Sequence, residues 1–202
     1  GGTASGGIFS PASSPDCIAV GAVNKEDEIS YYSSNGSPGD SYLRPDVVAP
    51  GGSLAPSGSS APRQPVFAAD SNDADTTRVD GEMPETDYYL NNFRGMQGTS
   101  MACPMVAGLA QLVIDAMIDR YGQWEYSWEN AKKIKQIICM GTFEVRNIEG
   151  NLATGGESYD GDGDGIAQNA PINRYSKDNV EGWGRVSAEA AIQAVTKWLN
   201  EC

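Results

Sequence analysis

The segment GTSMACPMVAG, residues 98–108, determines how this sequence is interpreted. Gly98 lets backbone and substrate approach closely, and Ser100 stands at the start of an apolar run. A helix that begins there points free N–H groups at developing negative charge, which suits a nucleophile that generates an oxyanion. The simpler interpretation is that Thr99 or Ser100 only caps the helix. Taken by itself, the serine favours the cap.

Apolar residues recur at helical spacing on the C-terminal side of this segment. We expect a helix from Thr99 or Ser100 to about Arg120, with Pro104 early in it, where a missing backbone donor costs less. Two more helices are expected, at roughly 127–140 with Gly141 ending it, and from Ser187 onward. Their core-facing residues are predicted to be Met101, Met105, Leu109, Leu112, Val113, Ala116 and Met117; Ala131, Ile134, Ile137 and Ile138; and Ala191, Ile192, Val195 and Leu199.

Two apolar runs precede the segment. CIAVGAV (17–23) is a short, branched run typical of a strand buried on both faces of a parallel sheet. Residues 28–53 indicate a short strand, a turn around Asn35-Gly36, and an apolar stretch at 47–49 that Pro50 stops.

Residues 54–95 differ from the rest because they are rich in carboxylates. We interpret them as an acidic surface insertion, with a cation site or a substrate-contacting flap as the alternatives. The acidic residues are Asp70, Asp73, Asp75, Asp80, Glu82, Glu85 and Asp87.

A second acidic motif runs Asp-Gly-Asp-Gly-Asp-Gly over residues 160–165. Asp160, Asp162 and Asp164 alternate with glycines, as in the opening of a calcium loop. Pro171 stands where such a loop needs a bidentate glutamate, so the motif is not an EF-hand, although Asp178 or Glu181 could close a different cage. Calcium is a candidate cofactor here, and an exposed acidic turn is the alternative.

Composition excludes several functions. The chain has 202 residues, a net charge of -13 and no stretch of 18 consecutive apolar residues, so nucleic acid and membrane are poor partners. It contains no histidine, so no Ser-His-Asp or Cys-His relay can be completed within it. The four cysteines, at 17, 103, 139 and 202, favour buried small residues, with disulfides left open.

Several segments together resemble the subtilisin-like serine proteases. Gly98, Thr99, Ser100, Met101 and Ala102, then Pro104 and Val106-Ala107-Gly108, closely match the family's serine motif. CIAVGAV, SSNG and RPDVVAPG resemble its preceding strand, turn and strand, and EGWGRVSAEAAI (181–192) resembles its closing helix entry. Cys103 and Met105 depart from the motif at positions that carry no catalytic group.

The resemblance implies an α/β fold with a mainly parallel sheet and flanking helices, of which this chain forms the C-terminal part over 1–202. It assigns Ser100 as the nucleophile and places Thr99 and Ser100 beside the oxyanion hole, while the family's histidine, aspartate and oxyanion asparagine lie earlier in the chain order. We therefore expect a secreted serine endopeptidase of protein or peptide substrates that needs its upstream part and is inactive alone. Self-association of the fragment is expected, because a cut sheet leaves an exposed edge. The alternative is a non-catalytic, calcium-dependent binding or regulatory fragment.

Overall fold

The computed structural model describes residues 8–36, 41–54, 64–69, 87–88, 93–145, 147–148 and 177–198. Its helices are α1 (Thr99–Tyr121), α2 (Trp128–Met140) and α3 (Ala188–Trp198). Its strands are β1 (Val20–Val23), β2 (Glu28–Ile29), β3 (Val47–Pro50), β4 (Val66–Ala69), β5 (Asp87–Tyr88), β6 (Phe93–Met96), β7 (Thr142–Phe143), β8 (Asn147–Ile148) and β9 (Arg185–Val186).

The main sheet has six strands in the order β7-β9-β3-β1-β2-β8. β1 and β3 are parallel, with Val20 opposite Val47 and Val23 opposite Pro50. The pairs β3–β9 and β2–β8 are also parallel, whereas β1–β2 and β7–β9 are antiparallel. The predicted α/β fold with a mainly parallel sheet is confirmed, as are the strands expected in 17–23 and at 47–49.

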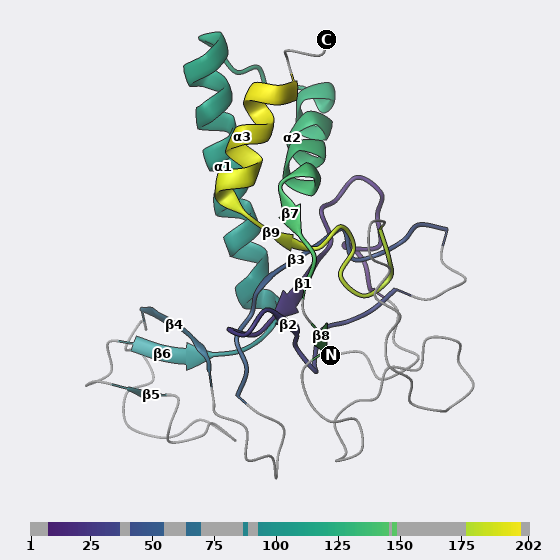
Figure 1. Ribbon diagram of the computed structural model, residues 1–202, viewed down its shortest axis with the longest axis vertical. Helices are drawn as coiled ribbons and strands as arrows, with labels where there is room; N and C mark the ends of the chain where they lie inside the picture. Colours follow the sequence, from purple (N-terminus) through teal and green to yellow (C-terminus); the bar gives the residue numbers. More distant parts are fainter. Residues whose placement is uncertain are drawn as a thin grey trace.

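Both faces of the central strands are buried, as expected for a parallel sheet. The three helices gather on one face (Figure 1), where Ala22, Val47 and Ala49 join their apolar side chains in one core cluster. On the other face, Val23 and Val48 belong to a smaller cluster. Side chains that alternate between two cores fix the register, because a slip by one residue would exchange the two faces.

The three helices begin and end close to where the sequence predicts. At α2 the Ser127 hydroxyl accepts a hydrogen bond from the Asn130 N–H, and at α3 the Ser187 hydroxyl accepts one from Ala190. Gly122, with φ 81°, ends α1, and its N–H donates to the Ile118 carbonyl at 2.7 Å. Left-handed backbone at this position is a common helix end because glycine has no Cβ.

The start of α1 differs from the prediction. Gly98 is the N-cap residue, and no side chain caps this end of the helix. The expectation that Thr99 or Ser100 caps α1 is therefore wrong. The helix starts instead where the chain leaves β6, and Gly98, with φ 150°, provides the turn.

Several residues predicted to face the core are exposed. Met105 and Leu112 of α1 are about half exposed, and Ala131 of α2 and Ile192 of α3 are also exposed. The described chain covers only part of each helix surface, so the apolar stripes are wider than the buried faces. Leu199 lies outside the described residues.

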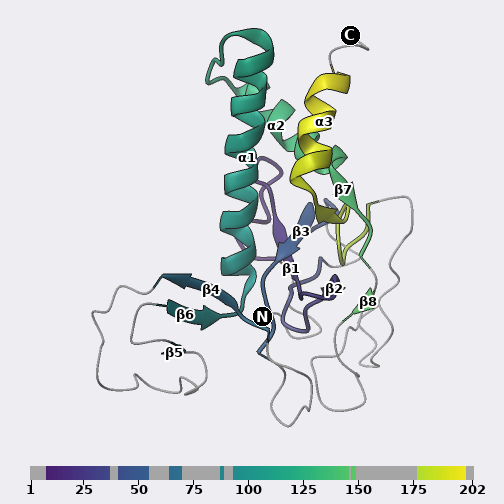
Figure 2. The same ribbon diagram turned by 60° about the vertical axis from the view of Figure 1, so that its left-hand side comes forward.

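Part of the acidic segment forms a second sheet. β4, β6 and β5 pair in that order, all antiparallel, and lie beside the N-terminal end of α1 (Figure 2). Most of the acidic residues of 54–95 lie outside the described residues, as does most of the turn expected after Asn35-Gly36.

α1 is the one helix, among the residues the structure describes, that is long and apolar enough to cross a membrane by length and composition. It packs against α2, α3, β1 and β3. Within the described chain 28% of this apolar window is buried, so packing on the sheet accounts for only part of the apolar character of α1.

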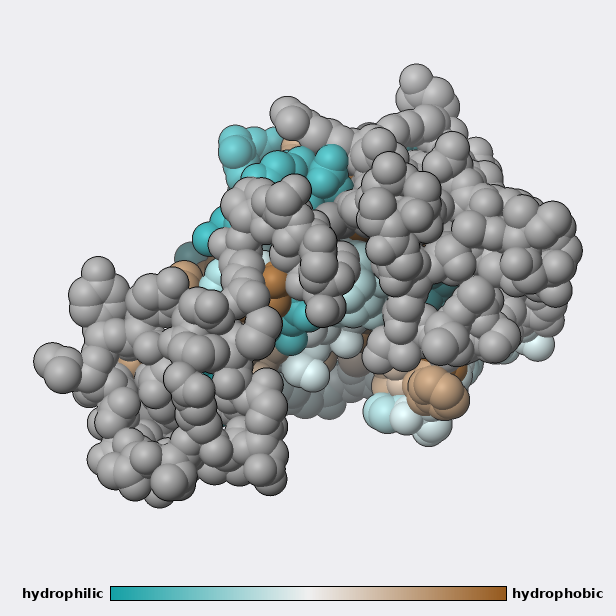
Figure 3. All heavy atoms as spheres, turned by 90° about the horizontal axis from the view of Figure 1, so that it is seen from below, coloured by the Kyte–Doolittle hydropathy of each residue, from teal (hydrophilic) through white to brown (hydrophobic). Residues whose placement is uncertain are grey.

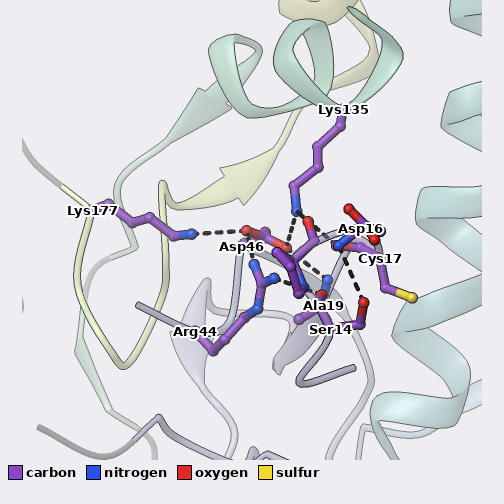
Figure 4. Close-up of polar contacts among 9 residues, drawn as sticks. Ser14, Asp16, Cys17, Ala19, Arg44, Asp46, Lys135 and Lys177 are labelled. Carbon is purple, nitrogen blue, oxygen red and sulfur yellow. Dashed lines mark hydrogen bonds and ion pairs between the residues drawn. The ribbon is translucent and has the colours of Figure 1, made fainter. Parts of the chain in front are cut away.

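A buried carboxylate joins the sheet to its surroundings. Asp46, just before β3, is 1% exposed, and its Oδ2 accepts a hydrogen bond from the Ala19 N–H at 2.9 Å. Three cationic side chains converge on it (Figure 4): Arg44, Lys135 of α2 at 3.0 Å, and Lys177 at 2.8 Å.

These contacts set the ionisation of Asp46. Burial raises the pKa of its carboxyl group. Hydrogen bonds from Lys177, the Ala19 N–H and Lys135 lower the pKa, and together they outweigh the effect of burial. The net pKa lies below the ordinary value of 3.8, so the group is a carboxylate at neutral pH. Breaking such a buried cluster leaves the cations uncompensated, which is strongly destabilising.

We predict that Asp46→Asn lowers the free energy of unfolding by about 3 kcal/mol at neutral pH. Because the folded-state pKa is depressed, the wild-type advantage is present above about pH 4 and is lost as pH falls through the folded value. Urea unfolding between pH 7 and pH 3 measures both effects. The matched control is Asp119→Asn on the exposed surface of α1, expected to change stability by less than about 0.5 kcal/mol. Equal stability of the two variants would contradict the assignment.

Candidate functional site

Ser100 lies in the first turn of α1, and its side chain is exposed. Among the described residues, its hydroxyl makes no hydrogen bond, since it is not used to cap the helix. An exposed, unengaged hydroxyl at a helix N-terminus is free to react with a substrate. The structure therefore removes the simpler interpretation of Ser100 as a capping residue.

A close approach of two glycines positions the serine. The Gly98 N–H donates to the carbonyl of Gly51, which follows β3, at 2.9 Å. A Cβ atom at Gly51 would lie 2.6 Å from the Ala22 Cβ, 2.7 Å from the Tyr32 hydroxyl and 2.8 Å from the Gly98 carbonyl oxygen. Only glycine fits at position 51, and α1 is thereby fixed to the C-terminal end of the parallel strands.

Side chains on both sides reinforce this contact. The Gln97 amide donates to the Tyr31 hydroxyl at 2.6 Å and accepts a hydrogen bond from the Leu54 N–H. The Tyr32 hydroxyl donates to the Gly52 carbonyl, also at 2.6 Å. Hydrogen bonds therefore join residue 52 to residue 32 and residue 54 to residue 97, next to the contact between Gly51 and Gly98.

Backbone donors are available next to the hydroxyl. Met101 and Ala102 donate their N–H groups to the Gly98 carbonyl, at 2.9 and 3.3 Å. In the part of the chain that the structure describes, the N–H groups of Thr99 and Ser100 have no backbone acceptor. Free donors at the positive end of a helix dipole are suited to hold an anion that forms beside Ser100.

The remaining residues of the serine motif lie along the first turns of α1. Ala102 is fully buried against the sheet, Met101 is half-buried, and Pro104 is exposed. Cys103 is also exposed, so the prediction that the cysteines are buried is wrong for this one. Cys17, Cys103 and Cys139 are free thiols, and Cys202 lies outside the described residues.

No metal centre is formed by the described residues, which contain no cluster of three or more His, Cys, Asp or Glu side chains arranged to hold an ion. Asp160, Asp162 and Asp164 lie outside those residues, so the calcium prediction stays a prediction. The site described here consists of a serine hydroxyl and backbone N–H groups.

The structure thus combines a mainly parallel α/β sheet with an exposed serine, not engaged in helix capping, at the N-terminus of a helix that packs on that sheet. The sequence profile of the subtilase family, peptidase S8, matches residues 2–191. The chain belongs to the subtilase family.

Comparisons with individual proteins agree. The chain is 34% identical over 98 residues to the serine protease/ABC transporter B family protein tagD of Dictyostelium discoideum, covering 48% of this chain and 4% of that protein. Its fold is similar to a lanthipeptide protease (TM-score 0.62, 22% identity, 92% of this chain and 43% of that one). The fold is also similar to that of the patellamide maturation protease PatA, with a TM-score of 0.53 and 18% sequence identity. The match covers 93% of this chain and 46% of PatA. The chain thus spans less than half the length of each of these proteins.

Sequence patterns alone do not predict the contact that positions the serine or the cluster around Asp46. Gly51 was part of the RPDVVAPG resemblance, but its contact with Gly98 joins segments 47 positions apart and leaves no local signal. Arg44 and Asp46 are two positions apart in the same motif, so their ion pair is local in the sequence. Lys135 and Lys177 come from distant segments and pair with Asp46 only in the folded chain.

We predict that Gly51→Ala destabilises the protein by about 1 to 3 kcal/mol, because the added Cβ overlaps backbone and side-chain atoms of three residues. Gly108→Ala in α1 is the matched control, since an added Cβ there meets nothing within 4 Å among the described residues. The control is expected to stabilise by up to about 1 kcal/mol, because glycine is unfavourable inside a helix. Thermal unfolding of both variants tests this, and a harmless Gly51→Ala would refute the close approach.

Proposed function

We propose that this chain carries the nucleophile, Ser100, of a serine endopeptidase that acts on proteins or peptides. One observation carries the proposal: the Ser100 hydroxyl is exposed and unengaged beside two free backbone N–H groups at the start of α1. Membership of the subtilase family supports it.

The proposed chemistry follows from this geometry. The Ser100 oxygen attacks the carbonyl carbon of the scissile peptide bond, and its proton passes to a general base. Negative charge then develops on the former carbonyl oxygen, and the Ser100 N–H is placed to stabilise it together with a second donor. The base later protonates the leaving amine, and water releases the acyl group.

The chain contains no histidine, so a histidine general base has to come from outside these 202 residues. We propose that an upstream part of the same protease supplies the histidine, the aspartate and the oxyanion asparagine. Met105 and Leu112 are exposed and lie seven positions, or two turns, apart on one side of α1, and this is the surface we assign to that part. Hydrophobic residues also reach the surface on the face seen from below (Figure 3). Without its upstream part the chain is expected to self-associate.

The first test uses a fluorophosphonate label and a peptidase assay, on the chain alone and together with the upstream part. We expect labelling of Ser100 and activity only for the combination. Ser100→Ala in the complete protein should lower kcat/KM by about 10⁴- to 10⁶-fold, because the nucleophile is lost. Persistent hydrolysis by that variant would reject Ser100, and inactivity of every combination would favour a non-catalytic binding or regulatory scaffold.

We also propose that Asp160, Asp162 and Asp164 bind calcium and that the protein is secreted. Three carboxylates separated by glycines supply hard oxygen ligands on a backbone that can bend around an ion. Replacing all three with asparagine should remove any rise in Tm caused by millimolar calcium. Glu125→Gln on the exposed α1–α2 connection serves as the control, and an unchanged calcium response of the triple variant would disprove the site.

A further inference from the structure

A pocket of about 970 Å³ lies at the opposite end of β3 from Ser100. Its floor is the cluster around Asp46, and its walls come from residues 41–43, the C-terminal part of α2 and the segment 177–183. Asp46 and Gly51 are five residues apart on an extended chain, or about 16 Å. The pocket is therefore remote from the serine and takes no part in the proposed peptide hydrolysis.

The cations on the floor outnumber the carboxylate that they share. Arg44, Lys135 and Lys177 all pair with Asp46, which leaves two uncompensated positive charges in this cluster. Such a concentration of positive charge is unusual in a chain with a net charge of -13. An anion that enters the pocket is attracted by this excess.

The hydrogen-bonding capacity of the two lysines differs. The Lys135 ammonium donates to three acceptors, namely the carbonyls of Pro15 and Cys17 and the carboxylate of Asp46. The Lys177 ammonium has three donors but only one acceptor among the described residues, the Asp46 Oδ1 at 2.8 Å (Figure 4). It is 18% exposed, so two of its N–H groups remain free for a ligand.

Two further carboxylates line the pocket, but they are engaged. Glu181 is buried, and its Oε2 accepts a hydrogen bond from the Val145 N–H at 2.8 Å. Glu144 also has an interaction partner. The fourth cation, Lys132, lies over the Trp128 ring, 4.7 Å from its centroid. Among the described residues the lining has four cations and three carboxylates, which gives a positive balance.

The walls are apolar and open to solvent. Four large hydrophobic side chains with exposed fractions of 45% to 54% line this pocket: Tyr42, Leu43, Met140 and Trp183. Exposed apolar side chains that gather around one pocket mark a ligand site more often than a random surface does. A ligand that fits must combine an apolar body with a negative end.

We propose that this pocket binds a carboxylate carried on an apolar body, with Lys177 as its hydrogen-bonding anchor and Tyr42, Leu43, Met140 and Trp183 around the apolar part. The C-terminal carboxylate of a peptide that ends in hydrophobic residues has this chemistry, and so does a free aliphatic acid. The site does not depend on the function proposed for Ser100.

The test is isothermal titration calorimetry with three probes: N-acetyl-Leu-Phe as the free acid, the same dipeptide as the C-terminal amide, and octanoate. The Ser100→Ala protein is used so that no probe is cleaved. We expect the dipeptide acid to bind about 10- to 100-fold more tightly than the amide, because a charged hydrogen bond is lost in the amide. Tighter binding of octanoate than of the dipeptide acid identifies a free organic acid as the ligand. Equal affinity for the dipeptide acid and amide, or no binding of either acid, overturns the proposal.

Variants locate the site. Lys177→Met should weaken binding of the acid by about tenfold or more, whereas Lys25→Met, an exposed lysine of the β1–β2 turn, should leave it unchanged. Because Lys177 also pairs with Asp46, Leu43→Ser serves as a second variant, which removes part of the apolar wall without touching the charged cluster. Unchanged affinity in both Lys177→Met and Leu43→Ser would place binding elsewhere and refute this pocket.

Discussion

The shared ion pair at Asp46 is the interaction on which the rest of the structure depends. One carboxylate receives hydrogen bonds from the strand segment at Ala19, from α2 through Lys135 and from the segment that leads to β9 through Lys177. The Asp46 carbonyl also accepts a hydrogen bond from the Trp183 N–H at 2.9 Å. Segments separated by more than 100 positions in the sequence are thereby joined at the start of β3, so the sheet, α2 and the C-terminal segment are fixed relative to one another.

The other end of β3 has a different constraint, which is steric. Asp46 binds its neighbours through charge. Gly51 has no side chain, so the start of α1 can approach it closely enough for the Gly98 N–H to donate to the Gly51 carbonyl. The central strand therefore fixes two features at once, the packing of the helices and the position of Ser100. Small displacements of β3 are transmitted to the serine because no flexible side chain lies between them.

Periodicity and motif together predict much of this fold. The apolar spacing of residues 99–121 and the short branched runs at 17–23 and 47–49 are local signals, and the elements form there. The exposure of Met105, Leu112, Ala131 and Ile192 is not predictable from spacing. The spacing identifies the apolar stripe of a helix, but not how much of that stripe another element covers. Nor is the uncapped start of α1 predictable, since Ser100 has the identity of a good N-cap and only the backbone path from Gly98 leaves it free. The partners of Asp46 come from separate segments, which only tertiary structure brings together.

Two cysteines of the helical layer also differ in their sulfur chemistry. Burial, and then the negative charge of Asp46, raise the pKa of the Cys139 thiol to about 11, so it stays protonated and unreactive at neutral pH. Cys103 is exposed on α1, three positions after Ser100. An alkylating reagent therefore modifies Cys103 in preference to Cys139. The rate of that reaction reports directly on whether another polypeptide covers this side of α1.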